Sequence, residues 1–245
     1  MQIVSLVNNK GSVAKTTTAL ALASGLSKRN FHALAIDCDA QANFSKASGG
    51  KDNVVGTFDI LTGKENINEV IQELPLYHLI GADKSLSSID VALNKPGREF
   101  QLKKALSQLS SAYDSCIIDN PPALNVAVTN YLVASHKIVI CSSAEASALD
   151  GLMELSANLD NVHQFMNPAL IVDGILITIF NPRTIIGQYM KEQLSRIAQV
   201  MNTKVYNTVI RRCNTISVSQ SDRKCIFYYS TTNAAMTMAI FLMNF

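Results

Sequence analysis

Short apolar runs alternate with helix-like segments along this chain, and that alternation restricts the possible fold more than any other feature. The runs fall at residues 2–8, 33–37, 115–120, 137–144, 174–180 and 203–211. Helical spacing of apolar residues separates several of them, at 16–29, 98–112, about 147–165 and about 184–201, and 232–245 forms a further helical segment. Such an order is typical of parallel βαβ units. We therefore expect an α/β fold with a mostly parallel twisted β-sheet and helices on both faces.

The chain reads as a single domain over residues 1–245, because no repeat, low-complexity run or linker interrupts it. Its content of 48% hydrophobic and 16% charged residues is enough to build a sizeable core. No apolar run reaches the roughly 18 residues that cross a membrane, and the first residues have no signal-peptide pattern. The five cysteines are scattered without a paired spacing, which indicates reduced thiols rather than a metal site. These features favour a cytoplasmic protein.

Three polar motifs directly follow predicted strands. They are NNKGSVAKTTT at 8–18, DCDAQAN at 37–43 and DNPP at 119–122. In parallel sheets, ligands bind beyond the carboxyl ends of the strands. The first motif lies between a strand and a helix, as a phosphate loop does, and it ends in the required Lys15 and Thr16. Because Asp119 follows an apolar run, it suits the carboxylate that holds a magnesium shell. The sequence therefore predicts a P-loop domain that binds a nucleotide.

The phosphate loop departs from the consensus at glycine positions. Asn9 and Ala14 replace the two glycines of GxxxxGK[ST], and Ser12 stands at a third position where glycine is common. Asparagine tolerates a left-handed backbone better than most residues, and alanine adds only one methyl group. These substitutions are costly only where φ is positive or where a phosphate approaches the backbone closely. We expect nucleotide binding to survive, with slow or altered hydrolysis.

Taken together, NNKGSVAKTTT, IDCDAQAN, YDSCIIDNPPALNVAVTNYLVAS, VIRR and KCIFYYSTTNAAM resemble the pattern of ParA/MinD-type ATPases, in order and spacing. The resemblance spans roughly residues 1–240, and its most specific mark is the additional Lys10 in KGSVAKT. It implies an ATP-dependent homodimer in which Lys10 reaches the phosphates held by the other subunit. Hydrolysis would then depend on dimerisation.

The resemblance also assigns roles within the site, with ATP as the nucleotide and Mg²⁺ as the metal ion. Lys15 would bind the β- and γ-phosphates, Thr17 would lie near the α-phosphate, and Asp39 would position the attacking water. The implied catalytic residues are Lys10, Lys15 and Asp39, and the implied metal residues are Thr16, Asp37 and Asp119. The implied nucleotide-binding residues are Lys10, Gly11, Ser12, Val13, Ala14, Lys15, Thr16 and Thr17. Ala40 and Asn120 depart from the family pattern without removing a catalytic group.

Within this family, the DNA-partition ATPases fit best. The segment VIRRCNTISVSQSDRKCIFYYSTTNAA resembles theirs, although Val218 and Ser219 replace an acidic EA pair. Residues 181–225 hold eight basic and two acidic residues, a pattern that fits either a polyanion partner or a solvated helical face. The candidates for nonspecific DNA binding are Arg183, Lys191, Arg196, Arg211, Arg212, Arg223 and Lys224.

The partition function would require a ParB-type centromere-binding partner and a nucleoid-associated location in the cytoplasm. Membrane binding is not favoured, because the last thirteen residues contain no Lys or Arg. A GTPase is also disfavoured, because NKPG at 94–97 lacks the final Asp of a guanine motif. The remaining alternative is an ATP-dependent scaffold of the same fold with impaired or absent hydrolysis.

Overall fold

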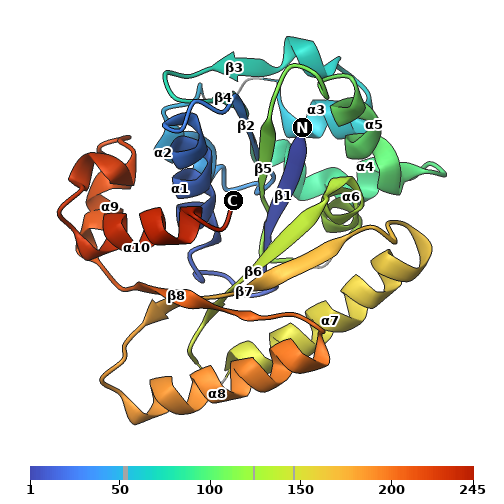
Figure 1. Ribbon diagram of the computed structural model, residues 1–245. Helices are drawn as coiled ribbons and strands as arrows, with labels where there is room; N and C mark the ends of the chain where they lie inside the picture. Colours follow the sequence, from blue (N-terminus) through green and yellow to red (C-terminus); the bar gives the residue numbers. More distant parts are fainter. Residues whose placement is uncertain (52–54, 124, 146) are drawn as a thin grey trace.

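A single eight-stranded sheet organises the computed structural model, which describes residues 1–51, 55–123, 125–145 and 147–245 (Figure 1). The strand order is β3-β4-β2-β5-β1-β6-β7-β8, and all neighbours are parallel except the antiparallel pair β3–β4. The strands are β1 (Gln2–Val7), β2 (Ala33–Asp37), β3 (Ile71–Glu73), β4 (His78–Ile80), β5 (Ser115–Asp119), β6 (Lys137–Ser143), β7 (Ile171–Phe180) and β8 (Val205–Arg211). The predicted α/β class with a mostly parallel sheet is confirmed.

Helices cover both faces of this sheet. The α-helices are α1 (Lys15–Ser27), α2 (Asn43–Ser48), α3 (Thr57–Thr62), α4 (Ile89–Ala92), α5 (Gln101–Ser107), α6 (Val126–Ala134), α7 (Ser147–Phe165), α8 (Ile185–Val200), α9 (Asn214–Ser221) and α10 (Asn233–Leu242). Two separate apolar cores result, one shared with α1 and α10 and the other with α3 and α5 to α8. In Figure 1, α9 and α10 lie on the left of the sheet, while α7 and α8 run together along the bottom.

Alternate side chains of the central strands feed the two cores. In β1, Val4 and Leu6 pack with α1 and α10, whereas Ile3 and Val7 pack on the opposite face. Because both faces are buried, β1 is apolar apart from the exposed Gln2 and the buried Ser5, and it therefore reads as a largely apolar run. A strand that is buried on both faces can therefore be recognised from its apolar run.

Several elements depart from the sequence-based expectation. Between β2 and residue 98, where no element was predicted, the chain forms α2, α3, β3, β4 and α4, and α6 was not predicted either. The expected helix at 98–112 is shorter, with α5 at Gln101–Ser107 after a short 3₁₀ turn at Arg98–Phe100. β7 begins at Ile171, three residues before the predicted start at 174. Within the described residues, no helix has both the length and the apolar character of a membrane span.

Candidate nucleotide site

The predicted phosphate loop connects the carboxyl end of β1 to the first turn of α1, and neighbouring strands anchor it. Asn8 is buried, and its amide donates to the Cys141 carbonyl in β6 at 2.7 Å while its Oδ1 accepts from the Lys10 N–H at 2.8 Å. The Thr178 hydroxyl in β7 donates to the Val13 carbonyl at 2.9 Å. The motif analysis missed both Asn8 and Thr178. A buried polar residue at a strand end was the only available signal for Asn8.

Two of the three departures from the glycine consensus lie in strained backbone. Ser12 has φ 58° and Ala14 has φ 59°, both in the left-handed region that favours glycine. A non-glycine residue in this region costs on the order of 1 kcal/mol. Asn9 serves a different purpose, since its side-chain amide donates to the Gly151 carbonyl in α7 at 3.3 Å. The loop therefore keeps its shape at a cost that is concentrated at positions 12 and 14.

Lys15 places its ammonium group inside the loop. Its Nζ donates to the carbonyl oxygens of Asn8 at 3.1 Å and Lys10 at 2.9 Å, and the residue is 6% exposed. Burial lowers the pKa of Lys15, while the nearby Asp119 carboxylate opposes this shift. The N-terminus of α1 adds free N–H groups, which favour negative charge. This position suits Lys15 for contact with a phosphate group.

Thr16 and Asp119 form the oxygen-rich corner where a magnesium ion fits. The Thr16 hydroxyl donates to Asp119 Oδ2 at 2.7 Å, while the buried Asp119 Oδ1 lacks a hydrogen-bond partner among the described residues. Burial and the neighbouring Asp37 raise the pKa of Asp119 well above its usual range. Mg²⁺ prefers hard oxygen ligands, and an orphaned buried carboxylate oxygen is such a ligand. The described residues contain no cluster of three acidic, His or Cys ligands, so phosphate and water oxygens would complete the shell.

Asp37 ends β2 directly beside Asp119 in the strand register. Its carboxylate accepts hydrogen bonds from the Ser45 N–H at 2.8 Å, the Ser45 hydroxyl at 2.7 Å and the Asp39 N–H at 3.1 Å. Burial raises the pKa of Asp37 to about 6, and the bonds from Ser45 oppose this rise. Ser45, which the sequence analysis missed, therefore holds Asp37 in place beside the expected metal position.

Asp39 lies on the loop after β2 and is only partly buried. Its Oδ1 accepts from the Gln41 N–H at 2.9 Å, and its charge reaches both Lys15 and Asp119. Because the carboxylate lies near the phosphate loop yet stays accessible, it meets the first requirement for orienting a water molecule.

Lys10, the most specific mark of the motif, is paired within its own chain. Its Nζ lies 3.0 Å from Glu145 Oε2, and the two side chains are 32% and 62% exposed. Glu145 is on the connection between β6 and α7, far away in sequence, and the motif analysis did not identify it. Exposed ion pairs contribute only about 0–1 kcal/mol, so Lys10 can exchange this partner at low cost.

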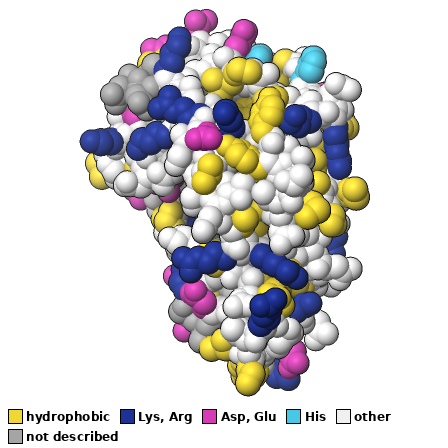
Figure 2. Space-filling view, turned by 90° about the vertical axis from the view of Figure 1, so that its left-hand side faces the viewer, with side chains coloured by type: hydrophobic (Ala, Val, Ile, Leu, Met, Phe, Trp, Pro, Cys, Tyr) yellow, Lys and Arg dark blue, Asp and Glu magenta, His cyan; other side chains and the backbone are white. Residues whose placement is uncertain are grey.

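The seven candidate DNA-binding residues are all exposed. On the side of the molecule that carries α9, Lys and Arg side chains gather in two groups, one at the level of α2 and α9 and one at the level of β8 and α8 (Figure 2). Arg223 and Lys224 follow α9, whereas Arg211 ends β8 and Lys191 lies on α8. A single chain therefore displays positive charge in separate places.

Comparison with known proteins relates the chain to a family. A family model described as an AAA domain matches residues 1–172. The chromosome partitioning protein ParA of Myxococcus xanthus is 34% identical over 233 residues, which cover 93% of this chain and 81% of that protein. The chromosome-partitioning ATPase Soj of Treponema pallidum is 35% identical over 209 residues, which cover 84% of this chain and 81% of that protein.

Solved structures share the fold at lower identity. Apo McdA of Cyanothece aligns with a TM-score of 0.89 at 18% identity, covering 100% of this chain and 98% of that one. The Mycobacterium smegmatis cobyrinic acid a,c-diamide synthase with bound ADP and magnesium aligns with a TM-score of 0.86 at 24% identity, covering 99% and 92%. At these identities the match extends to the fold alone.

Proposed function

Because this chain belongs to the ParA/Soj family of partitioning ATPases, we propose that it acts as an ATP-dependent DNA-partition ATPase. In this proposal, the protein dimerises around ATP, binds DNA nonspecifically in the cytoplasm at the nucleoid, and is reset by slow hydrolysis. A ParB-type centromere-binding partner stimulates that hydrolysis. The observation that carries the proposal is the phosphate loop with Lys15 inside it and the Thr16–Asp119 pair beside it.

Each side chain of the site has a task that its position supports. Lys15 and the first N–H groups of α1 bind the phosphates, and Thr16 with Asp119 holds the metal ion. Magnesium, when bound, neutralises charge on the phosphate oxygens. Asp39 orients the attacking water, while Asp37, fixed by Ser45, supports the metal shell. Lys10 leaves Glu145 and approaches the phosphates of the second copy, where it offsets charge on the transferring group.

DNA binding follows from dimerisation in this proposal. Phosphate contacts from exposed Lys and Arg give sequence-independent affinity that falls steeply with salt. One chain carries these residues in separate groups, so a pair of chains presents more of them to one duplex. The ATP-bound dimer is thus the form that holds DNA, and hydrolysis releases it.

Nucleotide binding is tested most simply with Lys15→Ala. We expect wild-type protein to bind a fluorescent ATP analogue in the presence of Mg²⁺, and we expect Lys15→Ala to bind none. Lys84→Ala, which alters an exposed lysine outside the site, is the matched control and should bind like wild type. Wild-type affinity in Lys15→Ala would contradict the assignment of the phosphate loop.

A second candidate function is an ATP-dependent scaffold that does not hydrolyse the nucleotide. The left-handed backbone at Ser12 and Ala14 favours this alternative. Both residues have side chains where glycine is usual, and both lie in the loop that would surround the phosphates during hydrolysis. A turnover assay with DNA and the cognate ParB-type partner separates the two functions. Phosphate release above background supports the ATPase switch, whereas ATP-dependent dimers without release support the scaffold.

A further inference from the structure

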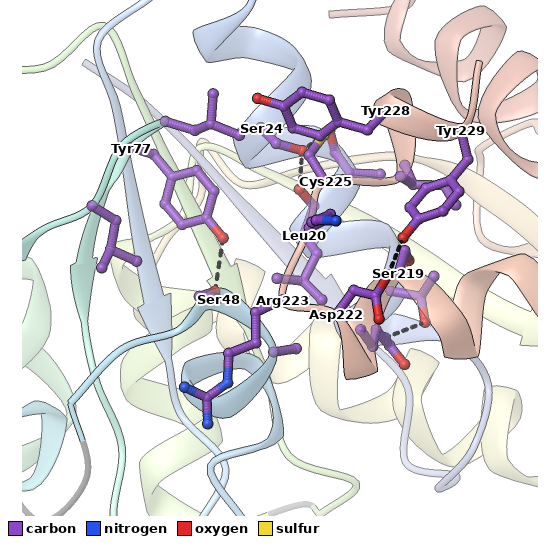
Figure 3. Close-up of a pocket in the computed structure, with 18 of the residues that line it drawn as sticks. Leu20, Ser24, Ser48, Tyr77, Ser219, Asp222, Arg223, Cys225, Tyr228 and Tyr229 are labelled. Atoms are coloured by element: carbon purple, nitrogen blue, oxygen red, sulfur yellow. Dashed lines mark hydrogen bonds between the residues drawn. The ribbon is translucent and has the colours of Figure 1, made fainter.

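A cleft of about 580 Å³ lies on the outer side of α1, next to the nucleotide site (Figure 3). α1 forms its floor, α2 and the β3–β4 turn form one wall, and residues 219–229 form the other. The Ser27 hydroxyl donates to the Leu76 carbonyl and so fastens the β3–β4 turn to α1. The volume is within the range of small-molecule sites, roughly 300–1,000 Å³. The lining is mainly apolar and aromatic, and includes Leu20, Ala21, Leu74, Leu76, Tyr77 and Ile226.

Tyrosine rings stand on both walls of the cleft. Tyr77 comes from the β3–β4 turn, while Tyr228 and Tyr229 come from the opposite wall (Figure 3). The hydroxyl of the buried Tyr77 is 2.7 Å from Ser48 Oγ, and the Tyr229 hydroxyl donates to Asp222 Oδ2 at 2.7 Å. These bonds hold the rings of Tyr77 and Tyr229 in place, while Lys28 Nζ lies 4.7 Å from the centre of the exposed Tyr228 ring. Aromatic surfaces favour a planar ring over a flexible aliphatic chain.

The cleft is lined by two positively charged side chains that are available to a ligand and by one negatively charged side chain that is already hydrogen-bonded. Arg223 and Lys224 line the cleft and are exposed, and within the described residues neither forms an ion pair. Asp222, which also lines the cleft, already accepts the Tyr229 hydroxyl. In Figure 3, the Arg223 side chain starts between the two walls and extends past the end of α2, where its Cδ would lie 3.7 Å from a Cβ on Gly49. The ligand should therefore carry a negative charge.

The backbone gives an independent reason to examine Arg223. Its φ of 53° lies in the left-handed region, where glycine is unstrained and another residue costs about 1 kcal/mol. The turn after α9 thus has no conformational need for an arginine. Strain of this kind recurs at binding sites, where the side chain that it positions compensates for it.

We propose that this cleft binds a small aromatic anion, meaning a planar ring that carries one carboxylate, sulfonate or phosphate group. The ring lies between Tyr77 and the Tyr228–Tyr229 wall, and the acidic group pairs with Arg223. This site is separate from the phosphate loop and goes beyond the partition function.

The cleft also touches the nucleotide site at one point. Gln220 and Thr17 both line it, and the Gln220 side-chain amide donates to the Thr17 hydroxyl at 3.2 Å. Thr17 directly follows the metal-site Thr16, so a ligand that displaces Gln220 alters the first turn of α1. Binding at the two sites is then coupled, and the coupling is reciprocal. This coupling rests on the proposed function, whereas the binding of an aromatic anion does not.

Calorimetric titration with 2-naphthoate tests the binding site directly. We expect 2-naphthoate to bind and 2-naphthalenemethanol, the neutral ring of the same size, to bind about tenfold more weakly. Arg223→Gly relieves the backbone strain and removes the cation, so it should weaken naphthoate about tenfold and leave the neutral alcohol unchanged. Tyr228→Ala, a change at a 63% exposed position that the fold tolerates, should weaken both ligands. Lys103→Ala on α5 is the control and should bind like wild type.

Three results would overturn the site: no naphthoate binding at millimolar concentration, equal affinity for the neutral alcohol, or undiminished naphthoate affinity in Arg223→Gly. For the coupling, saturating naphthoate should change the affinity for ATP about fivefold in wild type but not in Gln220→Ala, which still binds naphthoate. An unchanged ATP affinity in wild type would exclude the coupling. Failure of every protein to bind ATP would instead contradict the proposed function, while the naphthoate titration would stand on its own.

Discussion

Ser12 and Ala14 have backbone conformations that their side chains disfavour. Both adopt a left-handed backbone within the phosphate loop, where glycine would be free of strain. We expect Ser12→Gly and Ala14→Gly each to raise the free energy of unfolding by about 1 kcal/mol, measured by urea denaturation without nucleotide. Gly11→Ala is the control, because an added Cβ meets no atom within 4 Å, and its effect should stay within about 0.5 kcal/mol. Destabilisation by both glycine variants would show that the loop is unstrained.

Asp119 is suited to bind a metal ion, but its buried charge lowers the stability of the folded protein. Its buried Oδ1 lacks a partner among the described residues, and the carboxylate is next to Asp37. We expect Asp119→Asn to raise the free energy of unfolding of the nucleotide-free protein by about 2 kcal/mol, because an amide keeps the shape and removes the buried charge. The same variant should lose the dependence of nucleotide binding on Mg²⁺, measured by titration with and without EDTA. Asp90→Asn, at an exposed position on α4, should change neither property.

The gain in unfolding free energy that we expect from Asp119→Asn should become smaller as the pH falls. Burial raises the pKa of Asp119 well above its usual range, so the folded state binds this proton more tightly than the unfolded state does. The destabilisation by charge is therefore complete above the raised pKa of Asp119 and is relieved as the pH falls from there toward ~4, the usual pKa of an aspartate. The difference in unfolding free energy between Asp119→Asn and wild type should shrink over this window. A difference that grows on acidification would contradict the raised pKa.

At the scale of elements, the first residue of α3 is hydrogen-bonded to the last residue of β2 and holds that strand end in place. The Thr57 N–H donates to the Gly81 carbonyl at 2.9 Å, and the Thr57 hydroxyl donates to the Asp37 carbonyl at 2.6 Å. A Cβ on Gly56 would overlap the Gly81 carbonyl oxygen, so this close approach requires glycine. α3 therefore supports the position of Asp37 through the backbone.

We expect Gly56→Ala to lower the free energy of unfolding by about 2 kcal/mol, since the start of α3 must move away from the sheet. Thermal unfolding monitored by circular dichroism measures the effect. Gly151→Ala in α7 is the matched control, because its Cβ meets open space and alanine favours the helix by about 0.5–1 kcal/mol. An unchanged melting temperature in Gly56→Ala would show that α3 is not tightly packed at this point.

The elements that sequence reasoning found and missed differ in a physical way. The long buried strands β1, β5 and β6 read as apolar runs because both of their faces are covered. β3 and β4 have three residues each, too few for any period to emerge. α6 is buried on nearly all sides and lacks the polar face that marks a helix. Its available signal was Asn125, whose side chain caps the helix by accepting from the Val128 N–H at 3.0 Å.

The site was predictable where strand ends meet. Thr16 and Asp119 are far apart in sequence, yet their contact follows from the rule that ligands gather beyond parallel strands. Asn8, Ser45 and Glu145 were missed, because each acts through a hydrogen bond or ion pair that no motif encodes. The sequence showed that Ser12 and Ala14 replace glycines, but it could not show whether φ is positive at these positions. The backbone angles of the structure show that it is.

At the scale of the whole molecule, the proposed function depends on two copies acting together. Lys10 contacts Glu145 of its own chain, and the exposed cations are divided between two groups. If a dimer unites these cations on one duplex, log affinity for DNA should fall linearly with log salt concentration, with a slope of about −0.9 for each phosphate contact. Arg212→Ala should make that slope shallower by about one contact per chain, measured by DNA retention over a salt series. An unchanged slope would remove Arg212 from the interface.

The most direct test of the account is light scattering with and without ATP and Mg²⁺, combined with retention on duplex DNA. We predict that wild-type protein becomes a dimer with ATP and is retained at low ionic strength, and that Lys10→Ala binds ATP but remains a monomer that DNA does not retain. A wild-type chain that binds ATP yet stays monomeric and ignores DNA, or a Lys10→Ala chain that dimerises with wild-type affinity, would contradict it.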